Sequence, residues 1–369
     1  MLGVALLIIA VAAIFIGRDD GNKERFESLI DSVLPDGDPV DGSLLVGSAK
    51  KDFLTDPRVV EALRDEGFNI SVSTMGSLDM AQCASDGSLS DHDFYFPARD
   101  GNAELKSYVG AQSQEGLHVE SDIAIVARRD VAEDLASQGY IDVAEAQFQA
   151  NTRELYRLLS SGQRWRDITN TYLSPRTVGV LTSDPTRSYS SAQFAYLMAD
   201  AAMGVSLRST SNLDEGASRI APIFQAQGLT EGSSGDSFSQ FIAGRGQGTP
   251  MTVAYDSQFV ALVNQQPEQA EEFALIDLSP TVRVQHELVV NSGSVDAEEA
   301  GNFIRVMEEE QDVLTVMMEY GFAPAASSHY SSAFKERTRD ILPHNLQYLT
   351  PAPTMEDTTR LAGVLESLM

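Results

Sequence analysis

The stretch from residue 43 to residue 78 alternates short apolar strands with a helix, and this alternation constrains the fold most. Residues 43–48 and 68–73 have the apolar patterns of two strands. Asp56 and Pro57 begin a helix between them, and Gly67 follows its last residues. A strand, helix and strand in this order predict a parallel sheet with right-handed helical crossovers, and ligands of such sheets bind beyond the carboxyl ends of the strands.

The alternation continues along the rest of the chain, which favours an α/β fold with room for two domains. No internal repeat interrupts it. The same patterns predict strands over 122–129, 176–182, 249–255, 273–278 and 282–290, and helices over 131–165, 192–203, 237–243, 296–320 and 356–369.

The N-terminus predicts export. Residues 2–17 are uncharged and almost wholly apolar, slightly short of the roughly 20 residues of a typical membrane span. Small residues near Ala12 also leave a cleaved signal peptide open. We expect an uncleaved transmembrane anchor over 1–17 and a stalk over 18–42, with the bulk of the chain extracellular or periplasmic.

Charge and cysteine content exclude several function classes. Acids number 54 against 26 bases, which gives a formal net charge of −28. A nucleic-acid binder needs a basic face, so no nucleic-acid partner is expected. The single cysteine, Cys83, excludes an intramolecular disulfide framework and a Cys-rich zinc site.

No catalytic motif is readable, so the sequence predicts a protein that is not an enzyme. It lacks a nucleophile elbow, a P-loop and a dinucleotide-binding glycine motif. The five histidines have no metal-ligand spacing, and we interpret His286 as structural. We therefore expect neither a metal nor a cofactor.

Four turns share small residues and hydroxyls: 47–48, 76–77, 186–191 and 255–257. The first two follow strands, and the third opens a helix. A helix N-terminus with free N–H groups and nearby hydroxyls can bind an anion or a carboxylate, and Arg187 could add a charge. Each turn alone is more typical of ordinary capping, whereas their order along the chain is more informative.

In that order, the chain resembles a bacterial extracellular solute-binding protein of the class II periplasmic-binding type, close to the molybdate-like branch. The resemblance spans roughly residues 42–345. The residues that carry it are Val46-Gly47-Ser48, Met75-Gly76-Ser77, Asp184-Pro185-Thr186-Arg187-Ser188-Tyr189-Ser190, Ala254-Tyr255-Asp256-Ser257, His286-Glu287-Leu288 and Gly321-Phe322-Ala323-Pro324-Ala325.

The resemblance implies two α/β lobes joined by hinge strands, with a ligand held between them. Lobe I would comprise 43–130 and 280–369, and lobe II 131–279. Asp79 would repel an oxyanion if it faced the cleft. The residues that the resemblance implies as ligand-binding are Ser48, Gly76, Ser77, Thr186, Arg187, Ser188, Tyr189, Ser190, Tyr255 and Ser257.

The resulting hypothesis is a membrane-tethered binding protein that captures a small ligand, an oxyanion or a carboxylate-bearing solute being favoured, and delivers it to an ABC permease. The alternative is a sensory or interaction module of a cell-envelope complex that keeps the fold without transport. The two hypotheses differ in whether the cleft residues converge on one polar pocket, which solute capture requires.

Overall fold

The computed structural model describes residues 39–369 apart from 99–101, 111–115, 145–146, 206, 208, 229, 325–327 and 343–347. The expected anchor over 1–17 and nearly all of the expected stalk lie outside the described residues. Among the helices of the described part, none is both long and apolar enough to span a membrane.

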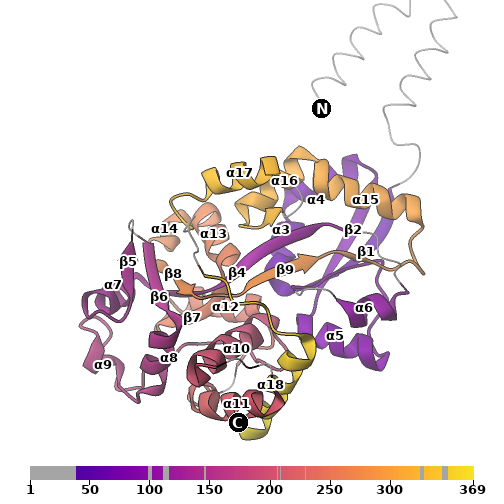
Figure 1. Ribbon diagram of the computed structural model, residues 1–369. Helices are drawn as coiled ribbons and strands as arrows, with labels where there is room; N and C mark the ends of the chain where they lie inside the picture. The colour runs from indigo at the N-terminus through magenta and orange to yellow at the C-terminus, as the bar shows by residue number, and fades with distance from the viewer. Residues whose placement is uncertain are drawn as a thin grey trace, which may run out of the picture.

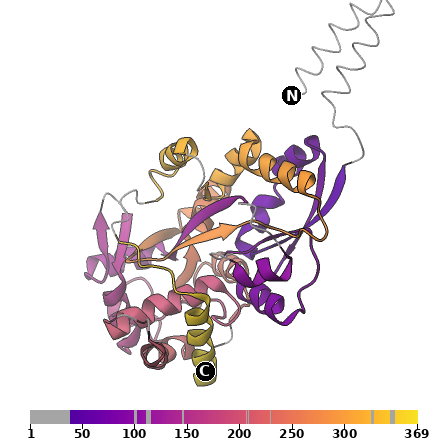
Figure 2. The ribbon, with the colours of Figure 1, turned by 45° about the vertical axis from the view of Figure 1, so that its right-hand side comes forward.

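Two lobes, each built on a β-sheet with helices on both faces, make up this part of the chain (Figures 1 and 2). The first sheet has the order β10–β3–β1–β2, with β1, β2 and β3 parallel and β10 antiparallel to β3. Its strands are β1 (Val40–Val46), β2 (Phe68–Thr74), β3 (Phe94–Phe96) and β10 (Val289–Val290). Its helices are α3 (Lys51–Leu54), α4 (Pro57–Asp65), α5 (Ser77–Asp86), α6 (Ala103–Tyr108), α15 (Ala297–Glu309) and α16 (Gln311–Glu319).

Strand β1 shows why helices cover both faces of this sheet. Successive side chains of a strand point to opposite faces. Leu44 and Val46 therefore pack with α4, α15 and α16, whereas Leu45 packs with Met80 of α5 and Leu105 of α6. Because helices cover both faces at this end of the strand, only the last three residues of β1 form a continuous buried hydrophobic run.

The second sheet contains β7, the later half of β4, β8, β6 and β5 in that order. Its strands are β4 (His118–Arg128), β5 (Asp142–Ala144), β6 (Gln147–Asn151), β7 (Met251–Tyr255) and β8 (Phe273–Ser279). Its helices are α7 (Arg129–Ser137), α8 (Thr152–Ser160), α9 (Trp165–Ile168), α10 (Tyr189–Met203), α11 (Thr210–Gln225), α12 (Ser234–Ala243), α13 (Asp256–Gln265), α14 (Pro267–Ala270) and α18 (Met355–Leu368).

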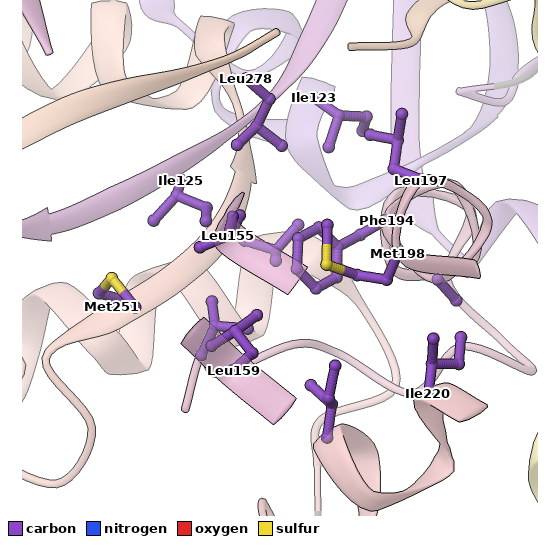
Figure 3. Close-up of a cluster of buried hydrophobic side chains, with 14 of the residues drawn as sticks. Ile123, Ile125, Leu155, Leu159, Phe194, Leu197, Met198, Ile220, Met251 and Leu278 are labelled. Carbon is purple, nitrogen blue, oxygen red and sulfur yellow. The ribbon is translucent and has the colours of Figure 1, made fainter. Parts of the chain in front are cut away.

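The main core of this lobe lies between the sheet and helices α8, α10 and α11. Figure 3 shows Ile123 and Ile125 of β4 on the side of Phe194 and Met198 of α10. The intervening residue, Ala124, faces the opposite core, which α12 and α13 cover. The period-two alternation of β4 thus builds a core on each face of the sheet.

Strand β4 also joins the two lobes. Its first half pairs with β9 (Arg283–Glu287) and β11 (Ala323–Pro324), and its second half pairs with β7 and β8. The chain returns between β8 and β9, where Thr281 donates from Oγ1 to the carbonyl of Ile123 at 2.6 Å. Thr281 also pairs with Leu349 as the chain passes toward α18. Helix α17 (Ser328–Arg337) lies against β11.

Two expectations about the second lobe are wrong. Residues 131–165 are not mostly helical, because a hairpin of β5 and β6 lies between α7 and α8. β5 has only three residues, all exposed, and β6 has only five, so neither strand is long enough to give a strong alternation signal. The predicted strand over 176–182 forms only isolated bridges, at Thr177 and Leu181.

Two expectations about the C-terminal part are also wrong. The single helix expected over 296–320 is two helices, because Glu310 is extended and lets both halves bury their apolar faces in one core. Residues 280–369 were expected to belong entirely to the first lobe. However, α18 packs on α10 and α11, where Leu361 and Leu365 enter the core of the second lobe (Figure 1).

A group of buried carboxylates lies where β4 changes partners. Asp122 of β4 is paired with Arg283, whose Nε and Nη2 lie 2.8 and 3.0 Å from the two carboxylate oxygens. Asp256 accepts hydrogen bonds from Ser121 Oγ and the Asp122 N–H. Burial and the nearby charge of Asp122 raise the pKa of Asp256 to about 7. Burial also raises the pKa of Asp277 on β8.

We expect this group to make stability fall as the pH rises. Between about pH 4 and pH 7 the folded chain holds a proton on Asp256 that the unfolded chain has released, so the free energy of unfolding decreases by up to about 1.4 kcal/mol per pH unit. Asp256→Asn, which keeps an acceptor for Ser121, should flatten this slope in urea unfolding of the full-length protein. The exposed Asp52→Asn should retain the slope, and equal slopes in both variants would contradict the prediction.

Candidate functional site

Turns from both lobes converge on one enclosed cavity at the carboxyl ends of β1 and β2. The cavity has a free volume of about 10 Å³, roughly the room of one water molecule. The described residues of its lining are uncharged and rich in hydroxyl groups. The lining residues are Gly47, Ser48, Ala49, Gly76, Ser77, Ala98, Ser188, Tyr189, Ser233, Ser234 and Tyr255.

The chain reaches this cavity at the starts of several helices. In the first lobe, β1 leads into the 3-10 turn η1 (Ser48–Lys50), and β2 leads through Gly76 into α5. In the second lobe, Ser188 and Ser233 are the N-cap residues of α10 and α12. Helix starts present free backbone N–H groups, so the cavity lies among groups that favour negative charge.

Six of the ten candidate ligand-binding residues line the cavity. They are Ser48, Gly76, Ser77, Ser188, Tyr189 and Tyr255. The other lining residues were not among the candidates: they are Gly47, Ala49, Ala98, Ser233 and Ser234. The concentration of glycine and serine over 228–248 was the signal that could have identified Ser233 and Ser234.

The other four candidates do not line the cavity. Thr186 bonds to Asp184, and Ser190 lies behind the lining with its Oγ 3.1 Å from that of Ser188. The Oγ of Ser257 lies 2.9 Å from that of Ser121, close to the crossing of β4. Arg187 lies beside the cavity and bridges the lobes.

Direct contacts between the lobes close the cleft. The Gly235 N–H of α12 donates to Ser48 Oγ at 3.0 Å. The Leu78 N–H at the start of α5 donates to the carbonyl of Arg187 at 3.2 Å. The Arg187 Nε also lies 2.8 Å from the carboxylate of Asp79. These contacts use groups of both lobes that a ligand would otherwise meet.

The contact with Arg187 changes the expectation for Asp79. We expected this carboxylate to repel an oxyanion if it faced the cleft. Arg187 instead neutralises it from the opposite lobe. Because both side chains are partly exposed, the pair contributes little to stability, at most about 1 kcal/mol.

Glycine is required for this close approach. A Cβ at Gly76 would lie 2.5 Å from the carbonyl oxygen of Arg187, and one at Gly235 would lie 3.0 Å from Ser48 Oγ. Gly76 has a φ of −58°, which any residue can adopt. Its lack of a side chain therefore matters for contact between the lobes and not for the local backbone.

A buried basic pair lies behind the cavity. The Nζ of Lys50 is 2.9 Å from Nδ1 of His286, and both residues are fully buried. Burial lowers the pKa of Lys50 well below its usual range. Burial and, secondarily, the charge of Lys50 lower the pKa of His286. Sequence reasoning assigned His286 only a structural role and did not single out Lys50.

The cavity offers binding chemistry and no visible catalytic chemistry. Its side-chain hydroxyls and backbone N–H groups can surround a small oxyanion or a carboxylate. Within the described ranges, no three His, Cys, Asp or Glu residues form a group that could hold a metal ion.

Comparisons with known proteins place the fold. No family model matches the chain. No curated protein matches it either. Solved structures do match over nearly their whole length, and because their sequence identities are low, the likeness concerns the fold alone.

Three such structures are binding or transport proteins by their titles. The sulfate-binding protein SubI from Mycobacterium tuberculosis H37Rv has a TM-score of 0.55 at 14% identity, over 89% of this chain and 99% of its own. A structure titled putative spermidine/putrescine ABC transporter, from Listeria monocytogenes, has a TM-score of 0.61 at 9% identity. The match covers 89% of this chain and 98% of that one. MotA from A. tumefaciens B6, in complex with glucopine, has a TM-score of 0.59 at 10% identity, and the match covers 89% of this chain and 99% of that one. The chain therefore has the two-lobed fold of solute-binding proteins.

We expect Gly76→Ala to prevent full closure of the cleft while leaving each lobe folded. The added methyl group would displace the carbonyl of Arg187 and break its bond with the Leu78 N–H. Hydrogen exchange of the Leu78 and Gly235 amides should then accelerate about tenfold, the loss expected for one hydrogen bond. Gly301→Ala, where nothing lies near the added Cβ, is the matched control. Unchanged exchange in Gly76→Ala would show that the two lobes do not meet at this point in solution.

Proposed function

We propose that this chain is a membrane-tethered extracellular solute-binding protein, which closes its two lobes around a small oxyanion or carboxylate-bearing solute. The observation that carries the proposal is the convergence of hydroxyl groups from both lobes on one neutral cavity. A ligand that contacts both lobes favours the closed state, because it binds the closed cleft more tightly than the open one. No bond of the ligand is made or broken.

The neutral lining favours an anion over a cation. A polyamine would need carboxylates, and no carboxylate is among the lining residues that the structure describes, while Asp79 is already paired with Arg187. The starts of α5, α10 and α12 instead supply N–H groups and favourable dipoles. The net charge of −28 opposes the approach of an anion, but salt screens distant surface charge more strongly than nearby dipoles.

Delivery to an ABC permease follows from this proposal, with the N-terminal segment holding the protein at the cell membrane. The lobes would present the loaded closed state to the permease. This step concerns residues 1–17 and a partner, and it depends on the sequence and on the likeness in fold.

One observation favours the alternative, an interaction module of the cell envelope without transport. The cavity is small, and Ser48 Oγ and the start of α5 are already occupied by groups of the opposite lobe. A cleft that satisfies its own polar groups needs no ligand to stay closed. Ligand binding therefore decides between the two functions.

We expect an oxyanion to stabilise the full-length protein in detergent. At one hundred times its dissociation constant a ligand adds about 2.7 kcal/mol, which thermal unfolding detects. The panel comprises sulfate, molybdate, phosphate and acetate, with spermidine and glucose as cationic and neutral solutes. Ser188→Ala should weaken binding about tenfold to a hundredfold, since it removes one hydrogen bond to a charged group.

The control is Ser218→Ala on the exposed face of α11, which should leave binding unchanged. If no solute of the panel shifts the unfolding temperature, solute capture loses its support and the interaction module is favoured. A shift with spermidine alone would retain solute capture and overturn the choice of an anion.

A further inference from the structure

Lys50 places a basic group in the interior directly behind the cavity. It ends the turn η1, two residues after Ser48, and its side chain is wholly buried. The Nζ lies 4.8 Å from the centre of the Phe96 ring and 2.9 Å from Nδ1 of His286. Among the described residues, no carboxylate bonds to Lys50.

Gly47 lies close both to this amine and to the lining of the cavity. The point that a Cβ on Gly47 would occupy is 3.4 Å from Lys50 Nζ, 2.9 Å from Ser77 Oγ and 3.3 Å from the Ala98 N–H nitrogen. Gly47, Ser77 and Ala98 all line the cavity. Lys50 Nζ therefore lies one side-chain width from the groups that would touch a ligand.

His286 connects the same pair to a second wall of the cavity. Its ring packs edge-on against Tyr255, with centroids 5.3 Å apart, and Tyr255 is a lining residue. The Nε2 of His286 is buried and bonds to no described group. The Lys50–His286 pair can therefore take up a proton, and the described protein groups offer no hydrogen-bond partner to His286 Nε2.

An unpaired ammonium group at this position is costly. A buried charge is strongly unfavourable unless an opposite charge or hydrogen bonds compensate for it. Burial lowers the pKa of Lys50 accordingly. An anion in the cavity would supply the missing opposite charge at short range, and a neutral solute or a cation would not.

The other charged groups around the pair are directed elsewhere. Lys51 and Asp52, which follow it in the chain, are exposed. The groups on neighbouring elements are Asp236 of α12, bonded to Ser233; Asp256 of α13, bonded to Ser121; and Glu287 of β9, paired with Lys106. Among the described residues, the phenol of Tyr255 is a further titratable group beside His286.

We propose that Lys50 determines the charge of the ligand, and that the Lys50–His286 pair takes up one proton from solvent when an anion enters the cleft. This inference rests on the proposed function and adds to it a residue that discriminates by charge. Anion and proton bind together, so the proton offsets one unit of the negative charge that the anion brings into the interior. The affinity for the anion then falls about tenfold for each unit by which the pH rises. This holds over the range in which the pair is unprotonated in the empty protein and protonated in the complex.

The test is calorimetric titration of sulfate into the full-length protein in detergent, near neutral pH, in buffers of low and high ionisation enthalpy. Sulfate carries no proton at that pH, so the difference between buffers counts the protons that the protein takes up. We expect about one proton per sulfate. Lys50→Met should abolish the uptake and weaken binding about tenfold or more.

The empty Lys50→Met protein should unfold at the same temperature as the parent or higher, because methionine fills the space without a charge. Lys51→Met is the matched control, since it makes the same substitution at the next residue of the chain, which is exposed. It should keep both the affinity and the proton uptake.

Sulfate binding without proton uptake, or with uptake unchanged in Lys50→Met, would overturn the inference and leave solute capture intact. Exclusive binding of glucose or spermidine would overturn the inference in the same way. If no solute of the panel binds, the inference and the proposed function both fail.

Discussion

The passage of β4 from the core of one lobe to the core of the other is the constraint on which the rest of the structure depends. Its first half pairs with β9 and its second half with β7 and β8, so the two lobes share one set of backbone hydrogen bonds. The return segment at Thr281 bonds to the same strand. Each lobe has its own core, and these crossings limit how the lobes can move relative to each other. Opening and closing as rigid bodies about the crossings is the motion that this arrangement favours.

The cleft is the consequence of placing two such lobes face to face. Strands β1 and β2 end at one edge of their sheet, and α10 and α12 begin opposite them. Because glycine has no side chain, the backbone of one lobe can contact a side chain of the other, as the Gly235 N–H does with Ser48 Oγ. The polar groups of the cleft are consequently shared between two roles: they close the lobes on each other, and they remain available to a small solute that replaces those contacts.

Sequence reasoning succeeded where a local signal was sufficient. Pro57 and the cap of Asp56 define the start of α4, and Gly67 follows its end with a φ of 87°. Prediction from the sequence failed where packing against residues distant in the chain determines the local structure. Strand β5 is short and exposed because it lies at the edge of the sheet, and Glu310 interrupts a helical pattern that is apolar on both sides of it. Neither feature has a distinctive residue pattern of its own.

The sequence by itself determined the order of strands, helices and small-residue turns, because caps, glycines and hydrophobic periodicity act within a few residues. The resemblance carried by these turns also implied six residues that line the cavity. Only the tertiary structure decided which turns meet, that Arg187 neutralises Asp79, and that Lys50 lies buried beside His286. Those contacts join residues far apart in the chain, and their formation depends on how the two lobes pack.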